Sequence, residues 1–413
     1  MSRRYWVETL GCPKNQVDSE KLAGTLGAEG LAPAASVAEA DVVVVNTCAF
    51  IEAARQESVD TILSLAGERA PGARLVVTGC MAERYGDELA EALPEADLVA
   101  GFGVPVTLGP ARDRARLDLL NLPRPPATAP WAYVKVAEGC DRKCGFCAIP
   151  SFRGPQRSRP MPAVLEEVDA LGVAEVVLVA QDLASYGRDV EGLGAGSIVP
   201  LVRAVAARVE RTRLLYLYPS DLTDALVDAI GDTGVPYFDL SLQHVSRPLL
   251  RSMRRWGDGE RFLRRIDDIR RRWPDAAFRS NFIVGYPGET EADHDALLRF
   301  LEEADLDWCG FFAYSPEEGT WAAGLDGAVA PGLVTERLAE ATALQDAITA
   351  RRRHALVGRS VDVLVDRPGV GRSHREAPEI DGIVRVPHHL PVGRIASVVV
   401  SGVEGPDLEA EAA

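Results

Sequence analysis

Short apolar runs alternate with longer mixed segments over the first hundred residues. The runs are continuous, as in VVVV at 42–45, and do not alternate between apolar and polar positions. Continuous runs are typical of parallel strands whose two faces are both covered by helices. The pattern therefore predicts an α/β domain with a doubly wound parallel sheet over residues 1–115. Its expected strands are Tyr5–Thr9, Asp41–Asn46 and Arg74–Thr78, followed by helices near Asp18–Leu26, Ala49–Leu65 and Glu83–Leu93.

A proline-rich segment, LPRPPATAP at 122–130, interrupts this pattern. Proline fits neither a helix interior nor a central strand, so we expect a domain boundary there. The alternation then resumes with six strand-like runs, which predicts a partial (β/α)6 parallel barrel over residues 126–355, ending in a long helix near Leu333–Leu356. The expected barrel strands are Ala132–Ala137, Glu175–Ala180, Leu214–Tyr218, Tyr237–Leu242, Arg279–Val284 and Trp308–Tyr314.

The last part of the chain has a different character. Short β-branched runs at Val361–Val365, Gly382–Val386 and Ala396–Val400 are separated by glycine and proline turns. This spacing is typical of a small β-barrel, which we expect over residues 357–413.

Composition and charge narrow the class of protein. The 413 residues are 47% hydrophobic and 26% charged, as in an ordinary globular protein. No run approaches the ~18 apolar residues of a membrane span, and no secretion signal is recognisable, so we expect a cytoplasmic protein without a membrane partner. A net charge of −16 argues against a protein that coats DNA or RNA.

One segment is basic despite the acidic total. Residues 247–272 contain ten arginines and four acids. Such a segment could dock ribosomal RNA or an acidic partner. A solvated helix face with internal ion pairs is the simpler interpretation of a charge run.

Seven cysteines carry the most specific signal. Cys140, Cys144 and Cys147 are packed into CDRKCGFC, and no second pair of cysteine or histidine follows to complete a zinc site. An odd number of cysteines without a secretion signal favours metal-binding or catalytic thiols over disulfides. Three thiolates suit an iron–sulfur cluster that presents its remaining iron to a small molecule.

A second set of three cysteines is scattered along the chain. Cys12, Cys48 and Cys80 each directly follow a predicted strand of the N-terminal sheet. Because the carboxyl ends of parallel strands share one edge, these thiols could converge there as a second incomplete thiolate site. The alternative is that each is a small buried residue. Cys309 lies within an apolar strand and is expected to be a core residue.

The spacing within CDRKCGFC, on the loop after the first barrel strand, resembles the signature of the radical S-adenosylmethionine enzymes. The resemblance implies a 4Fe-4S cluster on these cysteines that binds S-adenosylmethionine and cleaves it to a 5′-deoxyadenosyl radical. Phe146 resembles the family's aromatic residue at the adenine edge, although core packing would also explain it. Other candidates for cofactor or substrate contact lie at strand ends: Gln181, Asp182, Gln243 and His244. At Gly285 and Gly288 the backbone could approach the adenosyl group closely, although turn geometry alone would also explain these glycines.

The order of the three regions is similar to that of the methylthiotransferases, a subset of this superfamily with a C-terminal β-barrel of the TRAM type. That resemblance implies a second 4Fe-4S cluster on Cys12, Cys48 and Cys80, which holds the sulfur for transfer into a C–H bond. It also implies an electron donor such as flavodoxin or ferredoxin.

Several motifs resemble the RimO-type branch, which modifies an aspartate β-carbon in small-subunit ribosomal protein S-twelve. They are LGCPKNQVDSE, YSPEEGT and APEIDG. Residues 355–413 contain six basic and nine acidic residues, a net of −3, which suits a basic protein partner better than tRNA, and Glu317 and Glu318 point the same way. The alternatives are a tRNA adenosine methylthiotransferase and a non-enzymatic metal-binding protein associated with RNA.

Overall fold

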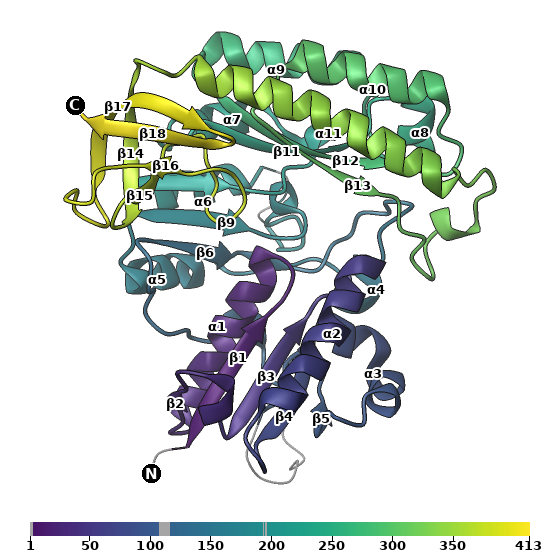
Figure 1. The fold of residues 1–413 in the computed structure, drawn as a ribbon, viewed down its shortest axis with the longest axis vertical. Coiled ribbons are helices and arrows are strands. Elements are labelled where there is room, and N and C mark those ends of the chain that lie inside the picture. Colours follow the sequence, from purple (N-terminus) through teal and green to yellow (C-terminus); the bar gives the residue numbers. More distant parts are fainter. Residues whose placement is uncertain (1–2, 107–115, 193, 195) are drawn as a thin grey trace. The chain divides into compact units, whose positions relative to one another are not determined.

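The computed structural model describes residues 3–106, 116–192, 194 and 196–413 (Figure 1). The chain forms two compact units. The first contains Met1–Pro126, Lys135–Asp141 and Cys147–Ala163, and the second contains Ala127–Val134, Arg142–Phe146 and Val164–Ala413. No helix in the described ranges is both long enough and apolar enough to cross a membrane.

The first unit is built on a five-stranded parallel sheet in the order β2-β1-β3-β4-β5. Its strands are β1 (Arg4–Thr9), β2 (Ala32–Pro33), β3 (Val42–Thr47), β4 (Arg74–Gly79) and β5 (Leu98–Val99), and its main helices are α1 (Pro13–Ala28), α2 (Glu52–Glu68) and α3 (Cys80–Ala92). The predicted doubly wound domain is confirmed. The two-residue strands β2 and β5 have no sequence signal of their own because they are too short to show a period.

The continuous valine run of β3 serves two hydrophobic cores. Val43 and Val45 pack in a cluster with residues of α2 and α3, whereas Val42 and Val44 pack in another with residues of α1. Successive side chains of a strand point to opposite faces, so a run without polar positions is what a sheet covered on both sides requires.

The second unit contains the partial barrel. Its six strands form two three-stranded sheets, β10-β9-β6 and β11-β12-β13, and a parallel bridge between Leu217 and Leu240 links the two halves. The strands are β6 (Trp131–Lys135), β9 (Glu175–Val179), β10 (Arg211–Leu214), β11 (Tyr237–Gln243), β12 (Ala277–Val284) and β13 (Trp308–Ala313).

Helices alternate with these strands, as predicted (Figure 1). They are α5 (Met161–Leu171), α6 (Ile198–Ala206), α7 (Asp224–Gly231), α8 (Arg247–Ser252), α9 (Gly259–Arg272), α10 (Glu291–Ala304) and α11 (Pro331–His354). The arginines of α9 form ion pairs with Asp224, Asp228, Glu260 and Asp268, which agrees with the interpretation of this basic segment as a solvated face.

The third barrel strand begins earlier than the expected Leu214–Tyr218. Arg211 and Arg213 lie inside the strand and are buried, and Arg213 donates from Nε to Glu175 at 2.8 Å. Because two of its four residues are arginines, this strand cannot be predicted from a run of apolar residues. Tyr216 has a φ of 65°, which ends the extended conformation inside the predicted range.

The C-terminal residues form a closed five-stranded barrel, as predicted, in the order β14-β15-β16-β18-β17. The strands are β14 (Ser360–Arg367), β15 (Val370–Arg372), β16 (Val384–Arg385), β17 (Ile395–Glu404) and β18 (Asp407–Ala412). Its core is aliphatic and includes Val363, Val384, Val398 and Leu408.

The segment that connects β15 to β16 reaches the starts of the large barrel's strands. Tyr133 donates its hydroxyl to Pro378 O, and Tyr237 donates to Asp381, both at 2.7 Å. Trp308 donates from Nε1 to Arg375 O, also at 2.7 Å. The connecting segment, residues 373–383, therefore covers the end of the barrel at which the strands begin. We call this end the lower rim; barrel enzymes bind their substrates at the opposite end.

Candidate active site

The scattered cysteines lie at one edge of the N-terminal sheet. Cys12 follows β1 and caps α1, Cys48 follows β3, and Cys80 is the first residue of α3 after β4. In the observed strand order the crossover direction reverses between β1 and β3, and ligands of such sheets bind at that reversal. The predicted edge is confirmed, and it is also the switch point of the fold.

The three thiols interact electrostatically with one another, and their environments differ. Burial, together with the neighbouring Cys12 and Cys80, raises the pKa of Cys48 to about 12. Burial also raises the pKa of Cys80, against the charge of Arg153. Burial opposes ionisation of Cys12, but Lys14 and Arg153 outweigh it and lower the pKa.

Two glycines make this arrangement possible. Gly11 has a φ of +93°, and a Cβ there would stand 2.9 Å from Cys48 Sγ. Gly79 has a φ of +94°, and a Cβ there would stand 2.3 Å from Asn46 Oδ1. Only glycine allows both this conformation and this approach.

Polar side chains around the thiols come from positions that the sequence analysis missed. Asn15 is fully buried and donates from Nδ2 to Leu10 O and Thr47 O at 2.9 and 3.0 Å. Its Oδ1 accepts from Arg153 at 2.6 Å. Ser58 accepts from the amide of Cys48 at 3.1 Å. Asn15 stands in the motif LGCPKNQ, three residues after Cys12. Its closeness to a predicted ligand is the one sequence feature that could have identified it.

The compact cysteines lie on the loop between β7 (Ala137–Glu138) and α4 (Ile149–Arg153). In the first unit, the amide of Cys140 donates to Gly154 O at 3.1 Å. In the second unit, Gly145 donates to Met253 O and accepts from the amide of Ala322, both at 2.8 Å.

Charged side chains of the second unit hold the same loop. Arg142 donates from Nε to Asp182 at 2.5 Å and also pairs with Asp221. Arg255 lies with Nη1 3.5 Å from Cys144 Sγ. The guanidinium carbons of Arg142 and Arg255 each lie 3.9 Å from the centre of the Tyr218 ring. Asp182 therefore fixes the cysteine loop, a more specific role than the cavity contact that its strand-end position suggested.

The other predicted residues have the following surroundings. Phe146 and Gln181 are partly buried. The missing Cβ of Gly285 would meet Val334 at 2.5 Å, whereas nothing lies within 4 Å of that of Gly288. Gly285 is therefore needed for packing, and the cofactor contacts of all four residues stay predictions.

Three further residues singled out from the sequence have the following contacts. His244 is fully buried, accepts from the amide of Ser246 at 3.0 Å, and has its pKa lowered to about 4 by burial. Cys309 lies in β13, is partly buried, and has its pKa raised by burial. Glu317 is only 2% exposed and accepts from Ser315 at 2.7 Å, so of the acidic pair only Glu318 offers its charge at the surface.

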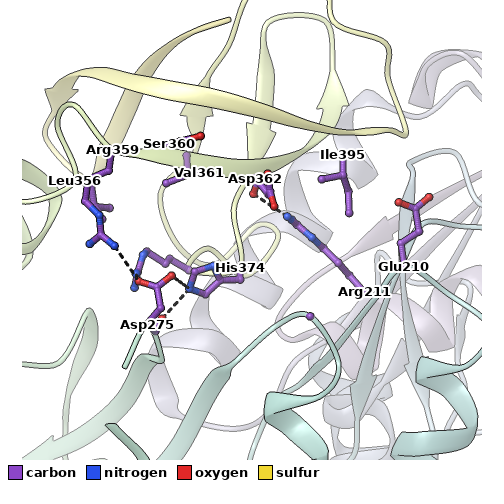
Figure 2. A pocket seen from close by; sticks show the side chains of 12 residues that line it. Glu210, Arg211, Asp275, Leu356, Arg359, Ser360, Val361, Asp362, His374 and Ile395 are labelled. Atoms are coloured by element: carbon purple, nitrogen blue, oxygen red, sulfur yellow. Dashed lines mark hydrogen bonds and ion pairs between the residues drawn. The ribbon is translucent and has the colours of Figure 1, made fainter. Parts of the chain in front are cut away.

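A cavity of about 450 Å³ lies elsewhere in the second unit, where the C-terminal barrel meets the large barrel (Figure 2). Its lining includes Arg211, Asp275, Arg359 and His374, and Asp275 pairs with both His374 and Arg359. None of the cysteines lines it, so it is separate from the candidate site.

The chemistry of the scattered thiols suits an iron–sulfur cluster. Within the described part of the chain, no three cysteine, histidine or acidic side chains are arranged to hold one metal ion. Ligands of an iron–sulfur cluster bind separate irons and need not converge on one point. Three mutually interacting thiols at a glycine-lined sheet edge are thus a suitable donor set for a polynuclear group.

Comparison with known proteins covers nearly the whole chain. The family model "Uncharacterized protein family UPF0004" matches residues 4–101, the Radical SAM superfamily model matches residues 134–301, and the TRAM domain model matches residues 357–413. The ribosomal protein uS12 methylthiotransferase RimO of Kineococcus radiotolerans is 42% identical over 99% of this chain and 97% of its own length. The protein of the same name from Moorella thermoacetica is 44% identical over 93% of each chain.

Solved structures show the same fold at low sequence identity. The radical S-adenosylmethionine methyltransferase TsrM from Kitasatospora setae, solved with cobalamin and a [4Fe-4S] cluster, matches with a TM-score of 0.53 at 14% identity. The match covers 90% of this chain and 80% of that one.

Proposed function

The chain belongs to the family of ribosomal protein uS12 methylthiotransferases, and on that premise we propose how its residues serve the reaction. Its activity is methylthio transfer to protein uS12 by radical S-adenosylmethionine chemistry, and we propose the β-carbon of an aspartate as the acceptor. The observation that carries the assignment is identity of about 42% over nearly the full length of several RimO proteins. The three domains are proposed to span residues 1–115, 126–355 and 357–413.

The cofactors of this family are S-adenosylmethionine and two 4Fe-4S clusters. We assign the radical-generating cluster to Cys140, Cys144 and Cys147, and the sulfur-delivering cluster to Cys12, Cys48 and Cys80. When bound, these groups supply one-electron cleavage of S-adenosylmethionine and a held sulfur, which no protein side chain provides.

The chain's own residues place and shield these groups. Arg142 and Gly145 fix the compact loop through Asp182, Asp221, Met253 and Ala322. Cys48 and Cys80 are only 7% and 8% exposed, so their position limits access of water to the held sulfur. Phe146, Gln181, Gly285 and Gly288 are the proposed contacts for S-adenosylmethionine.

Two finer points complete the proposal. The reductant is an electron donor such as flavodoxin or ferredoxin, and the enzyme works in the cytoplasm. The net of −3 on residues 355–413 supports a basic protein as the partner of the C-terminal barrel.

The test is mass analysis of uS12 and of tRNA from a strain that lacks the gene. We expect uS12 to lose the mass of one methylthio group, with tRNA unchanged. Loss of a methylthio group from tRNA with uS12 intact would instead assign the chain to the tRNA-modifying branch.

Complementation of that strain with Cys48→Ala assigns the roles of the two cysteine sets. After anaerobic reconstitution we expect about four irons per chain, against about eight in the unaltered protein, because one four-iron cluster is lost. Reductive cleavage of S-adenosylmethionine should persist while uS12 stays unmodified.

Tightly bound zinc without cleavage in the unaltered protein would favour a non-enzymatic metal-binding protein.

A further inference from the structure

Arg153 reaches the sulfur-delivering site from a distant part of the sequence. It is the last residue of α4, and its side chain is only 3% exposed. One end of its guanidinium, Nη2, lies 3.1 Å from Cys80 Sγ and 2.6 Å from Asn15 Oδ1. Cys80 Sγ itself lies 3.6 Å from the same Asn15 oxygen.

The other end of the guanidinium is held by two carboxylates. Nη1 donates to Asp18 at 2.8 Å and to Glu138 at 3.1 Å. Lys135 pairs with the same two carboxylates, at 2.6 Å from Glu138. The ring of Phe102 lies 4.1 Å from the guanidinium carbon.

This cluster balances its own charge before any thiolate is counted, since Lys135 and Arg153 face Asp18 and Glu138. Neutralising the second carboxylate needs only a positive charge and not an arginine in particular, and a buried ion pair alone seldom repays its desolvation. The planar fork of arginine instead allows one end to be fixed while the other donates to sulfur.

We propose that Arg153 is a positioning residue of the sulfur-delivering cluster, which holds the Cys80 thiolate by an N–H···S hydrogen bond and makes that cluster easier to reduce. The inference rests on the proposed assignment of Cys12, Cys48 and Cys80 as cluster ligands. Its physical basis is that donors to ligand sulfurs, and positive charge beside them, stabilise the extra negative charge of the reduced state.

The experiment isolates the N-terminal cluster. In a chain carrying Cys140→Ala, Cys144→Ala and Cys147→Ala, iron per chain and the midpoint potential are measured for Arg153, Arg153→Gln and Arg153→Lys. Arg159→Gln in the same background is the matched control, because Arg159 is also buried and donates to Lys135 O at 3.1 Å and to Asn121 Oδ1 at 3.2 Å. Thermal melting of each variant reports folding.

We expect about four irons in the background and a more negative midpoint potential for Arg153→Gln. Arg153→Lys should lower the midpoint potential by a smaller amount, because an ammonium keeps the positive charge but cannot donate to both Asp18 and the sulfur. Arg159→Gln should leave the potential unchanged.

Potentials of both Arg153 variants equal to that of Arg159→Gln would overturn the proposal. So would loss of the cluster in Arg153→Gln combined with full iron and an unchanged potential in Arg153→Lys, since Arg153 would then serve folding alone. Absence of iron from the background itself would instead refute the ligand assignment, and with it the inference.

Discussion

At the scale of single residues, Gly79 decides where Cys80 can lie. It ends β4 and precedes α3 directly, with a positive φ and with Asn46 and Thr47 against the position of its missing Cβ. The proposed sulfur-delivering site is therefore fixed by backbone conformation as much as by its thiols.

Gly79→Ala should destabilise the first unit and displace Cys80. The added methyl would meet Asn46 Oδ1 at 2.3 Å and backbone atoms of Thr47 at 2.6 Å, so overpacking of about 1–3 kcal/mol adds to the strain of the positive φ. Gly72→Ala is the control, because Gly72 has a φ of +85° but nothing within 4 Å of its Cβ position. Chemical denaturation and iron content measure the effect; equal losses in both variants would contradict it.

Glu175 illustrates a second residue-scale effect, on pH dependence. Burial opposes its ionisation, but the charges of Arg372 and Arg213 outweigh burial and lower the pKa to about 2. Because the folded pKa lies below the ordinary value of 4.5, the carboxylate contributes stability above about pH 4.5, and this contribution is lost as the pH falls toward 2.

Glu175→Gln should therefore reduce the free energy of unfolding by about 3 kcal/mol at pH 7, because the two arginines hold the pKa of the native carboxyl at about 2, below its ordinary value. The difference between the two proteins should shrink as the pH falls from 5 to 2. Denaturant midpoints across that range measure it, and a difference independent of pH would show that the loss comes from packing.

At the scale of elements, the apolar pattern predicted most strands, most clearly β3, β4 and β9, which are buried on both faces. It misplaced β10, where Arg211 and Arg213 are satisfied by Glu175 and by carbonyls of the C-terminal barrel. Partners that are distant in sequence leave no local signal. The six cysteines could be predicted as candidate ligands from their spacing and their positions after strands. Arg153 and Arg255 could not be predicted as their neighbours, because only the fold brings each guanidinium to a sulfur.

At the scale of the whole molecule, the C-terminal barrel is part of the structure of the second unit. Its connecting segment satisfies Tyr133, Tyr237 and Trp308 at the starts of three strands. Arg213 likewise donates to His374 O at 2.9 Å. A module used only to bind a partner would not need to complete the barrel in this way.

A chain truncated after Ala355 should lose stability as well as substrate binding. Removing residues 356–413 exposes the lower rim and strips its buried polar groups of their partners, at about 1–3 kcal/mol for each group that water does not satisfy. We expect the melting temperature to fall by roughly 10 °C. Melting within about 2 °C of the full chain would show that the barrel is an independent module.

The anchors of the compact cysteine loop also set an order of events during biosynthesis. The loop takes its hydrogen-bond partners from as far along the chain as Met253 and Ala322. The scattered thiols take theirs from residues no later than Arg153. A nascent chain emerging from the ribosome thus contains every partner of the scattered thiols well before it contains the anchors of the compact loop. We expect iron loading to follow the same order, so that the proposed radical chemistry becomes available last.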